Sequence, residues 1–273
     1  MRPGFAQAGR TRRPSLHDLV RERLKKMAND PSENDPGRND PTGTDQSRKA
    51  QEKEAAAQAS LRFVQEGQIV GLGTGTTATH FIKLLGERVK NGLKVRGIPT
   101  SERSRQLALS LGIPLTTLDE YQEIAVTVDG ADEVDPQLRL IKGGGGALLR
   151  EKIVASATRK LVIVADASKQ VSRLGKFPLP VEVIKFAQEL VAKKIAALGA
   201  RVDLRLGTDG KPFLTDENNH ILDCNFGEID DVDGLARKLS DMPGVVEHGL
   251  FIGMASVVLF ARGKEIVELR RGT

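Results

Sequence analysis

Short apolar segments alternate with segments of helical spacing between residues 68 and 166. The apolar segments are 68–73, 94–100, 124–134 and 160–166, and the helix-like segments between them are 76–92, 101–112 and 147–157, with another at 51–64. Strands joined by helices of this length pair in parallel, and the helices cover both faces of the sheet. The pattern therefore predicts an α/β fold around a mostly parallel sheet.

The order of elements changes after residue 178. We expect a strand at 178–184, a helix at 186–199, strands at 202–207 and 213–223, a helix at 231–244 and a strand at 245–251. This β-α-β-β-α-β order is typical of a ferredoxin-like α+β domain. Residues 255–271 should form a strand pair or a strand extension in the first domain. We therefore predict a first domain at 47–178 plus 255–273, with a lid domain at 179–254 inserted into it.

The basic character of the chain comes from its first residues. Residues 1–28 hold eight Arg and Lys against Asp18 and Glu22, a balance of +6, whereas the whole chain has a net charge of +5. The remainder is therefore close to neutral, which argues against a nucleic-acid partner for the folded part.

Residues 29–47 contain no aliphatic side chain, so we expect 1–46 to be a disordered extension. Residues 15–27 could form a short amphipathic helix, and the Arg-rich start could be a targeting segment. A coding start at Met27 is the simpler explanation.

Composition argues against membrane, redox and zinc functions. No apolar run approaches the roughly 18 residues of a membrane helix, and no secretory signal is recognisable. The single Cys224 cannot form a disulfide within the chain, and the four histidines are too scattered for a zinc site. We expect a cytoplasmic protein without metal, cofactor or membrane partner.

The glycine-rich segment from Gly71 to Ala78 follows the first apolar strand and opens a helix. Glycines allow close backbone approach, and helix N–H groups favour an anion. The spacing also meets a dinucleotide fingerprint, but Pro99, Thr100 and Ser101 stand where that fold needs an acidic residue, and no Walker A lysine follows. The hydroxyls of Thr74, Thr76 and Thr77 favour a sugar phosphate, with a purely structural turn as the alternative.

The carboxylates Asp129 and Asp132 come immediately after the apolar residues 124–128. Strand ends of this kind face ligand crevices in open α/β sheets. These side chains could bind sugar hydroxyls or Mg²⁺, although Lys142 would compete with a metal ion; alternatively, they cap a turn.

Lys142 and the four glycines after it, Gly143 to Gly146, are the most specific feature. Successive exposed N–H groups form an anion-binding nest, and Lys142 adds a positive charge. Glu151 on the following helix could face the same crevice, although such a Glu is commonly solvated. Lys169, just beyond the strand at 160–166, could contact a phosphate or simply be solvated.

Six motifs in this order closely resemble the ribose-5-phosphate isomerase family of the A type. They are GLGTGTTA, TSERSRQLA, VDGADEVD, KGGGGALLREK, VADASK and GVVEHGLF, and the resemblance runs from about Ser47 to the C-terminus. It implies a Rossmann-like domain with a ferredoxin-like lid, a homodimer or tetramer, no cofactor or metal, and interconversion of D-ribose 5-phosphate and D-ribulose 5-phosphate.

The resemblance also implies roles for individual residues. Glu151 would move a proton between C2 and C1 through an enediolate, Asp129 and Asp132 would assist ring opening and oxygen protonation, and Lys142 would hold oxygens. The substrate-binding set as a whole is Lys53, Thr74, Gly75, Thr76, Thr77, Asp129, Gly130, Ala131, Asp132, Lys142, Gly143, Gly144, Gly145 and Lys169.

Two other classes share the expected core. One is the sugar-phosphate-sensing domain of transcription regulators, which needs a helix-turn-helix that we do not recognise here. The other comprises amino-sugar phosphate deaminases and acyl-CoA transferases. The presence of Glu151 favours catalysis, and product analysis with ribose 5-phosphate would separate these enzymes.

Overall fold

A mostly parallel sheet forms the centre of the larger domain. The computed structural model describes residues 41–263 and 265–271, and all contacts discussed below lie within residues 45–273, which form one unit. The strands of this sheet, within that described part, are β1 (Ile69–Leu72), β2 (Arg96–Pro99), β3 (Val126–Asp129), β6 (Leu161–Asp166), β12 (Ala255–Arg262) and β13 (Glu265–Arg270). Their order is β13-β12-β6-β3-β1-β2, and β13 pairs antiparallel with β12 while the other pairings are parallel. The predicted α/β class and the strand pair at the C-terminal end are confirmed.

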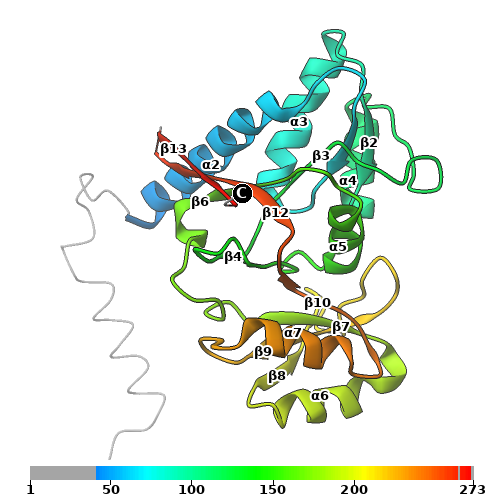
Figure 1. Cartoon of the computed structure of the whole chain (residues 1–273), viewed down its shortest axis with the longest axis vertical. Helices are drawn as coiled ribbons and strands as arrows, with labels where there is room; N and C mark the ends of the chain where they lie inside the picture. Colours follow the sequence, from blue (N-terminus) through cyan, green and yellow to red (C-terminus); the bar gives the residue numbers. More distant parts are fainter. Residues whose placement is uncertain (1–40, 264, 272–273) are drawn as a thin grey trace, which may run out of the picture. The chain divides into compact units, whose positions relative to one another are not determined.

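Both faces of this sheet are buried. Alternate residues of β6 point to opposite faces, and Val162 and Val164 belong to one apolar cluster while Leu161 and Ile163 belong to another. Helices α2 (Pro41–Ser60) and α3 (Thr76–Lys90) cover the first face (Figure 1). The opposite face contacts α5 (Leu148–Ser156) and a small sheet of β4 (Glu133–Val134), β5 (Leu140–Ile141) and β11 (Leu250–Phe251). Helix α4 (Glu102–Ser110) packs beside α3 and β2.

Helix α2 begins earlier than the sequence analysis predicted. We expected a disordered extension to residue 46 and a helix from residue 51, whereas the helix begins at Pro41. Proline suits the first position of a helix because its missing N–H has no partner there in any case. The rest of the predicted extension and the possible helix at 15–27 lie outside the described residues.

The segment 124–134, predicted as one strand, is divided in two. The carboxylate of Asp129 accepts hydrogen bonds from the N–H groups of Thr74 (3.0 Å) and Gly130 (2.8 Å), and the chain leaves the large sheet at this point. Glu133 and Val134 then pair with β5 instead. This break directs residues 130–132 toward the carboxyl ends of the strands.

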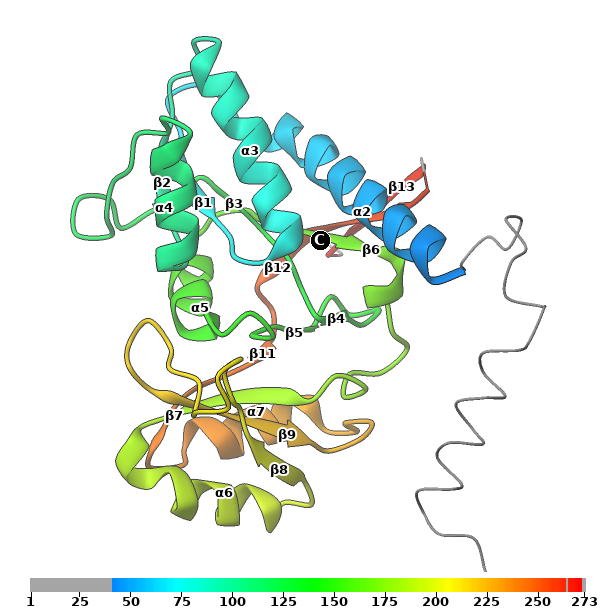
Figure 2. The same cartoon turned by 180° about the vertical axis from the view of Figure 1, so that it is seen from behind.

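The smaller domain has the predicted ferredoxin-like order. Its elements are β7 (Leu179–Val183), α6 (Gln188–Ala196), β8 (Arg201–Leu204), β9 (His220–Asn225), α7 (Val232–Ser240) and β10 (Val245–His248). The antiparallel sheet has the order β10-β7-β9-β8, and α6 and α7 cover one face of it (Figure 2). We propose residues 179–254 as the limits of this inserted lid.

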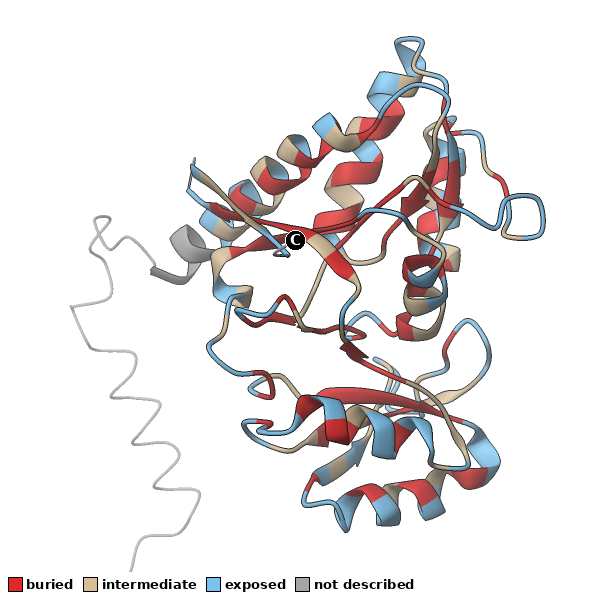
Figure 3. Ribbon diagram, viewed as in Figure 1, coloured by how far each residue is buried: buried red, intermediate tan, exposed pale blue. Residues whose placement is uncertain are grey.

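The other face of the small sheet is directed toward the glycine run that follows Lys142. Pro180 lies against Gly143, and its carbonyl accepts a hydrogen bond from the N–H of Gly249 (2.7 Å). The strand predicted at 213–223 begins only at His220, because a turn between Thr215 and Asn219 replaces its first part. Figure 3 shows buried residues along β7 and on the helix faces directed toward the sheet. In the part of the chain that the structure describes, none of the helices could span a membrane.

Candidate active site

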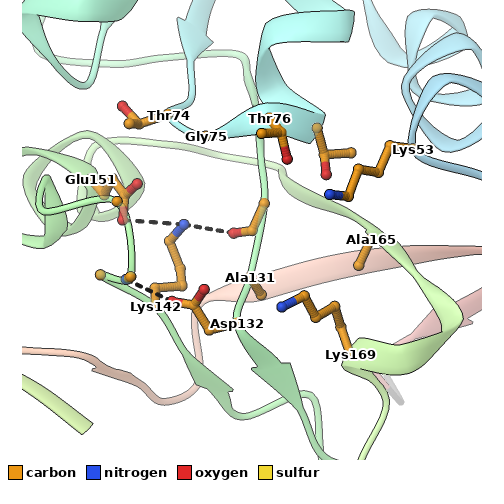
Figure 4. Close-up of a pocket in the computed structure, with 15 residues that line it drawn as sticks. Lys53, Thr74, Gly75, Thr76, Ala131, Asp132, Lys142, Glu151, Ala165 and Lys169 are labelled. Carbon is orange, nitrogen blue, oxygen red and sulfur yellow. Dashed lines mark hydrogen bonds and ion pairs between the residues drawn. The ribbon is translucent and has the colours of Figure 1, made fainter. Parts of the chain in front are cut away.

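One pocket lies where the parallel strands end. The loops after β1, β3 and β6 meet there, as expected because parallel strands carry their carboxyl ends to the same edge of a sheet. The glycine run and residues of α2, α3 and α5 complete it (Figure 4). The pocket is lined by Lys53, Thr74, Gly75, Thr76, Thr77, Gly130, Ala131, Asp132, Lys142, Gly143, Gly144, Gly145, Glu151, Ala165 and Lys169.

The structure brings the predicted site residues together. Glu151 and every predicted substrate-binding residue except Asp129 line this pocket, although the positions span more than one hundred residues of sequence. Asp129 lies directly behind it, buried and paired with Lys142. Ala165, which also lines the pocket, was not predicted, because a small residue in a buried strand looks like any other core position.

Close approach of two strand ends explains the glycines after β1. A Cβ atom on Gly73 would lie 2.3 Å from Oδ1 of Asp129, a distance that no real side chain allows. The N–H of Gly73 instead donates to the carbonyl of Val128 (3.0 Å). The next residue, Thr74, donates its N–H to Asp129. These contacts hold the loop against the end of β3.

Lys142 lies at the centre of a buried group of charges. Its Nζ is 2.9 Å from Oδ2 of Asp129 and 3.3 Å from Oε2 of Glu151, and it donates a hydrogen bond to the carbonyl of Gly130 (2.6 Å). Burial lowers the pKa of Lys142, but the neighbouring carboxylates Asp129, Glu151 and Asp132 outweigh that effect, so the net shift is upward. Lys142 is therefore a permanent cation at the base of the pocket.

Both oxygens of Asp129 are already engaged. Oδ1 accepts two backbone N–H groups and Oδ2 faces Lys142. The resemblance to the family implied a direct part for Asp129 in the chemistry, whereas these contacts support a positioning part, in which Asp129 aligns Lys142 and the loop after β1.

The carboxylate of Glu151 is buried, although Glu151 lies in the first turn of a helix, where such side chains are commonly exposed. Its side chain is 5% exposed, and Oε2 makes no hydrogen bond even though Nζ of Lys142 is near. Burial raises the pKa of Glu151 to about 8; Lys142 opposes this shift, and Asp129 and Asp132 add to it. A carboxylate with a pKa near neutrality is suited to accept and return a proton.

The glycine run provides a backbone donor to Asp132, another carboxylate of the pocket. Gly143 has φ +104° and Gly146 has φ +82°, a region that L side chains rarely adopt. The N–H of Gly144 donates to Oδ2 of Asp132 (2.7 Å). Asp132 is thereby held at the pocket wall, next to the glycine amides.

The opposite end of the pocket is cationic. Figure 4 shows the amino groups of Lys53 and Lys169 at the end where α3 begins, away from Glu151. Gly75 precedes α3 and provides no side-chain cap, so the first N–H groups of that helix are not occupied by a capping side chain. A helix N-terminus between two lysines favours an anion such as a phosphate.

A group of hydroxyl side chains surrounds Thr74, and the sequence did not predict this group. Oγ1 of Thr74 lies within hydrogen-bond distance of the hydroxyls of Thr100 (2.8 Å), Ser101 (2.7 Å) and Ser104 (3.3 Å). The side chain of Thr74 therefore anchors the loop to the start of α4. The sequence feature that could have indicated this group is the presence of Thr100 and Ser101 after β2, where a dinucleotide-binding fold has an acidic residue.

The residues of this pocket do not resemble a metal site. Among the residues that the structure describes, no group of three or more His, Cys, Asp and Glu side chains is arranged to hold a metal ion. Lys142 occupies the position between Asp129 and Glu151 that a cation would take. The expected independence of metals and cofactors stays a prediction.

Polar residues at the carboxyl ends of parallel strands, with a helix start and two lysines at one end and a buried glutamate at the other, are typical of an α/β enzyme for a small anionic substrate. Residues 96–265 match the family model of ribose 5-phosphate isomerase A (phosphoriboisomerase A). The chain therefore belongs to the ribose 5-phosphate isomerase A family.

Individual members of this family are similar to the chain in sequence and in structure. The chain is 53% identical to ribose-5-phosphate isomerase A of Parvibaculum lavamentivorans over 225 residues, which are 80% of this chain and 97% of that protein. It is 42% identical to the solved ribose 5-phosphate isomerase A of Methanocaldococcus jannaschii, with a TM-score of 0.77 over 80% of this chain and 97% of that one. A D-ribose-5-phosphate isomerase in complex with phospho-erythronic acid is 39% identical, with a TM-score of 0.78 over the same shares.

Proposed function

We propose that this enzyme interconverts D-ribose 5-phosphate and D-ribulose 5-phosphate in the non-oxidative pentose phosphate pathway. The observation that carries the proposal is the position of Glu151: a buried carboxylate beside Lys142, at one end of a pocket whose other end suits a phosphate. The complex of a relative with phospho-erythronic acid supports a phosphorylated sugar acid or sugar as the ligand.

The two ends of the pocket suggest how the sugar lies. The phosphate would bind at Gly75, Thr76 and Thr77, with Lys53 and Lys169 neutralising its charge. The sugar chain would then extend toward Glu151 and bring C1 and C2 to its carboxylate. Asp132 would bind a sugar hydroxyl and assist ring opening.

Proton transfer through an enediolate needs a base and a stabilised oxygen. Glu151 would remove the proton from C2 of the aldose and return it to C1, while one proton leaves the C2 hydroxyl and one is added to O1, so that no atom is gained or lost. The charge that develops on the carbonyl oxygen would be stabilised by Lys142 and the amides of Gly144 and Gly145, and the N–H of Gly144 would exchange its contact with Asp132 for this oxygen. Such donors are effective because they are already oriented before the reaction.

A coupled assay on ribose 5-phosphate tests the proposal. We expect conversion without added metal, and an unchanged rate after treatment with EDTA. In D₂O, the product should carry solvent deuterium at C1, because an enediolate intermediate exchanges its proton through the base. Loss of activity with EDTA that Mg²⁺ restores would contradict the metal-free mechanism, and absence of conversion would contradict the proposal itself.

The raised pKa of Glu151 predicts the pH dependence of the reaction. The carboxylate is the active form of a base, and its fraction rises with pH until the pKa of about 8 is passed. We expect kcat/KM to rise about tenfold per pH unit between about pH 6 and pH 7.5 and to level off above about pH 8.5. An ordinary glutamate would already give a plateau near pH 6. A flat profile across this range would show that Glu151 has an ordinary pKa in the free enzyme.

We also propose a homodimer, with a tetramer as the alternative, and a cytoplasmic location. Both proposals, the oligomeric state and the location, are supported by membership of the family and not by a particular contact in the structure. The mass of the purified protein, measured by light scattering, distinguishes a dimer from a tetramer.

A further inference from the structure

Arg205 connects the small domain to the glycine run of the pocket. It follows β8, and its Nη1 donates to the carbonyls of Gly143 (2.8 Å) and Gly144 (3.3 Å). The rest of the guanidinium pairs with the carboxylate of Asp223 on β9, with Nε 2.9 Å from Oδ2 and Nη2 in contact with Oδ1. Only 13% of the Arg205 side chain is exposed. This arginine does not line the pocket, and the mechanism above does not use it.

The two carbonyls that Arg205 contacts belong to the peptide groups whose N–H groups are those of Gly144 and Gly145. The described chain has no cis peptide bonds, so in each group the N–H points away from the carbonyl and hence away from Arg205. The N–H of Gly144 accordingly reaches Asp132 at the pocket wall. Arg205 is thus placed on the outer side of the peptide groups that line the site.

A glycine run needs such a contact because glycine does not hold its own conformation. Glycine has access to conformations on both sides of φ 0°, so a peptide group between two glycines can rotate and turn its N–H out of the pocket. A cation that binds both carbonyls opposes this rotation. It also polarises the peptide groups, and hydrogen bonds in a chain strengthen one another in this way.

We propose that Arg205 is a positioning residue for catalysis: held by Asp223, it fixes and polarises the amides of Gly144 and Gly145, which stabilise the enediolate oxygen. This inference rests on the proposed function. Phe213, from the same loop, supports the other end of the run, because a Cβ atom on Gly146 would lie 2.5 Å from its ring. The small domain therefore contributes to the reaction through its hold on the glycine run.

Substitution of Arg205 tests this role with kinetics. We expect Arg205→Ala to lower kcat by about 10- to 100-fold, somewhat less than the loss of a direct oxyanion donor, with KM changed less than about threefold. Affinity for 4-phospho-erythronic acid, which presents a carboxylate to the amides, should fall in parallel with kcat/KM. Affinity for inorganic phosphate should not change, since the phosphate end of the pocket is separate.

Chemical rescue separates positioning from folding. Guanidinium at low millimolar concentration should restore part of the activity of Arg205→Ala and leave the wild type unchanged. The activity of Arg205→Lys should be lower than that of Arg205→Ala with guanidinium, because one ammonium group cannot hold two carbonyls and both oxygens of Asp223. The matched control is Arg201→Ala, since Arg201 is an exposed arginine of β8 that pairs with Asp203.

The outcomes are distinguishable from failure of the proposed function. An inactive wild type would contradict the proposed reaction, whereas an active wild type is required for the Arg205 test. Wild-type kcat in Arg205→Ala would overturn the positioning role. A loss of activity that guanidinium does not restore, and that follows the fraction of unfolded protein measured by circular dichroism, would overturn it as well.

Discussion

Replacing Glu151 with glutamine will abolish isomerisation almost completely. The amide has nearly the same volume but cannot accept the proton, so we expect kcat to fall about 10²- to 10⁴-fold, the contribution of a positioned general base. Binding of the phosphorylated sugar should stay nearly normal, because the cationic end of the pocket is untouched. The measurement is the coupled assay, together with titration of 4-phospho-erythronic acid.

The same substitution should leave stability intact at neutral pH. Burial raises the pKa of Glu151 above its unfolded value, so the folded protein holds a proton there that the unfolded chain releases as pH rises from about 4.5 toward about 8. The contribution of this carboxyl to the free energy of unfolding therefore falls as pH rises through this window. The amide of Glu151→Gln does not titrate, so it does not cause this fall. Glu87→Gln, at an exposed position of α3, is the matched control. Near-normal turnover of Glu151→Gln would exclude Glu151 as the base.

Replacing Lys142 with alanine will damage both the reaction and the fold. The buried carboxylate of Asp129 loses the cation that compensates it, and breaking a buried ion pair in this way costs about 3–5 kcal/mol. We also expect kcat to fall by at least about 100-fold and by more than KM rises, because in the proposed mechanism Lys142 stabilises a charge that develops only during the reaction.

Two further variants separate the effects of Lys142. Urea unfolding of Lys142→Ala, compared with Lys142→Ala/Asp129→Asn, measures how much of the lost free energy of unfolding comes from the uncompensated Asp129 charge. The double variant should recover part of the stability but none of the activity. Lys83→Ala, at an exposed position of α3, is the control. An effect of Lys142→Ala confined to KM would assign Lys142 to substrate binding alone.

Much of the fold could be predicted because its signals are local. The alternation of apolar strands and helices between residues 68 and 166, and the change of order after residue 178, predicted the two larger sheets and their helices, but not the small sheet of β4, β5 and β11. Two errors occurred where hydrogen bonds decide a boundary, one between distant residues and one within a local turn. Asp129 binds the N–H of Thr74 and so ends β3, and the turn at Thr215–Asn219 delays the start of β9. Neither contact leaves a periodic signal.

For this protein, the sequence by itself determined the fold class, the family and which residue types gather at the strand ends. Those properties follow from periodicity and from short motifs, which are local in the chain. The tertiary structure alone decided the orientation of the groups: that Asp129 faces Lys142 behind the pocket, and that Glu151 is buried with a raised pKa. It also revealed Arg205 behind the amides of the glycine run. The physical reason is that hydrogen bonding, burial and charge interactions depend on distances between residues that lie far apart in sequence.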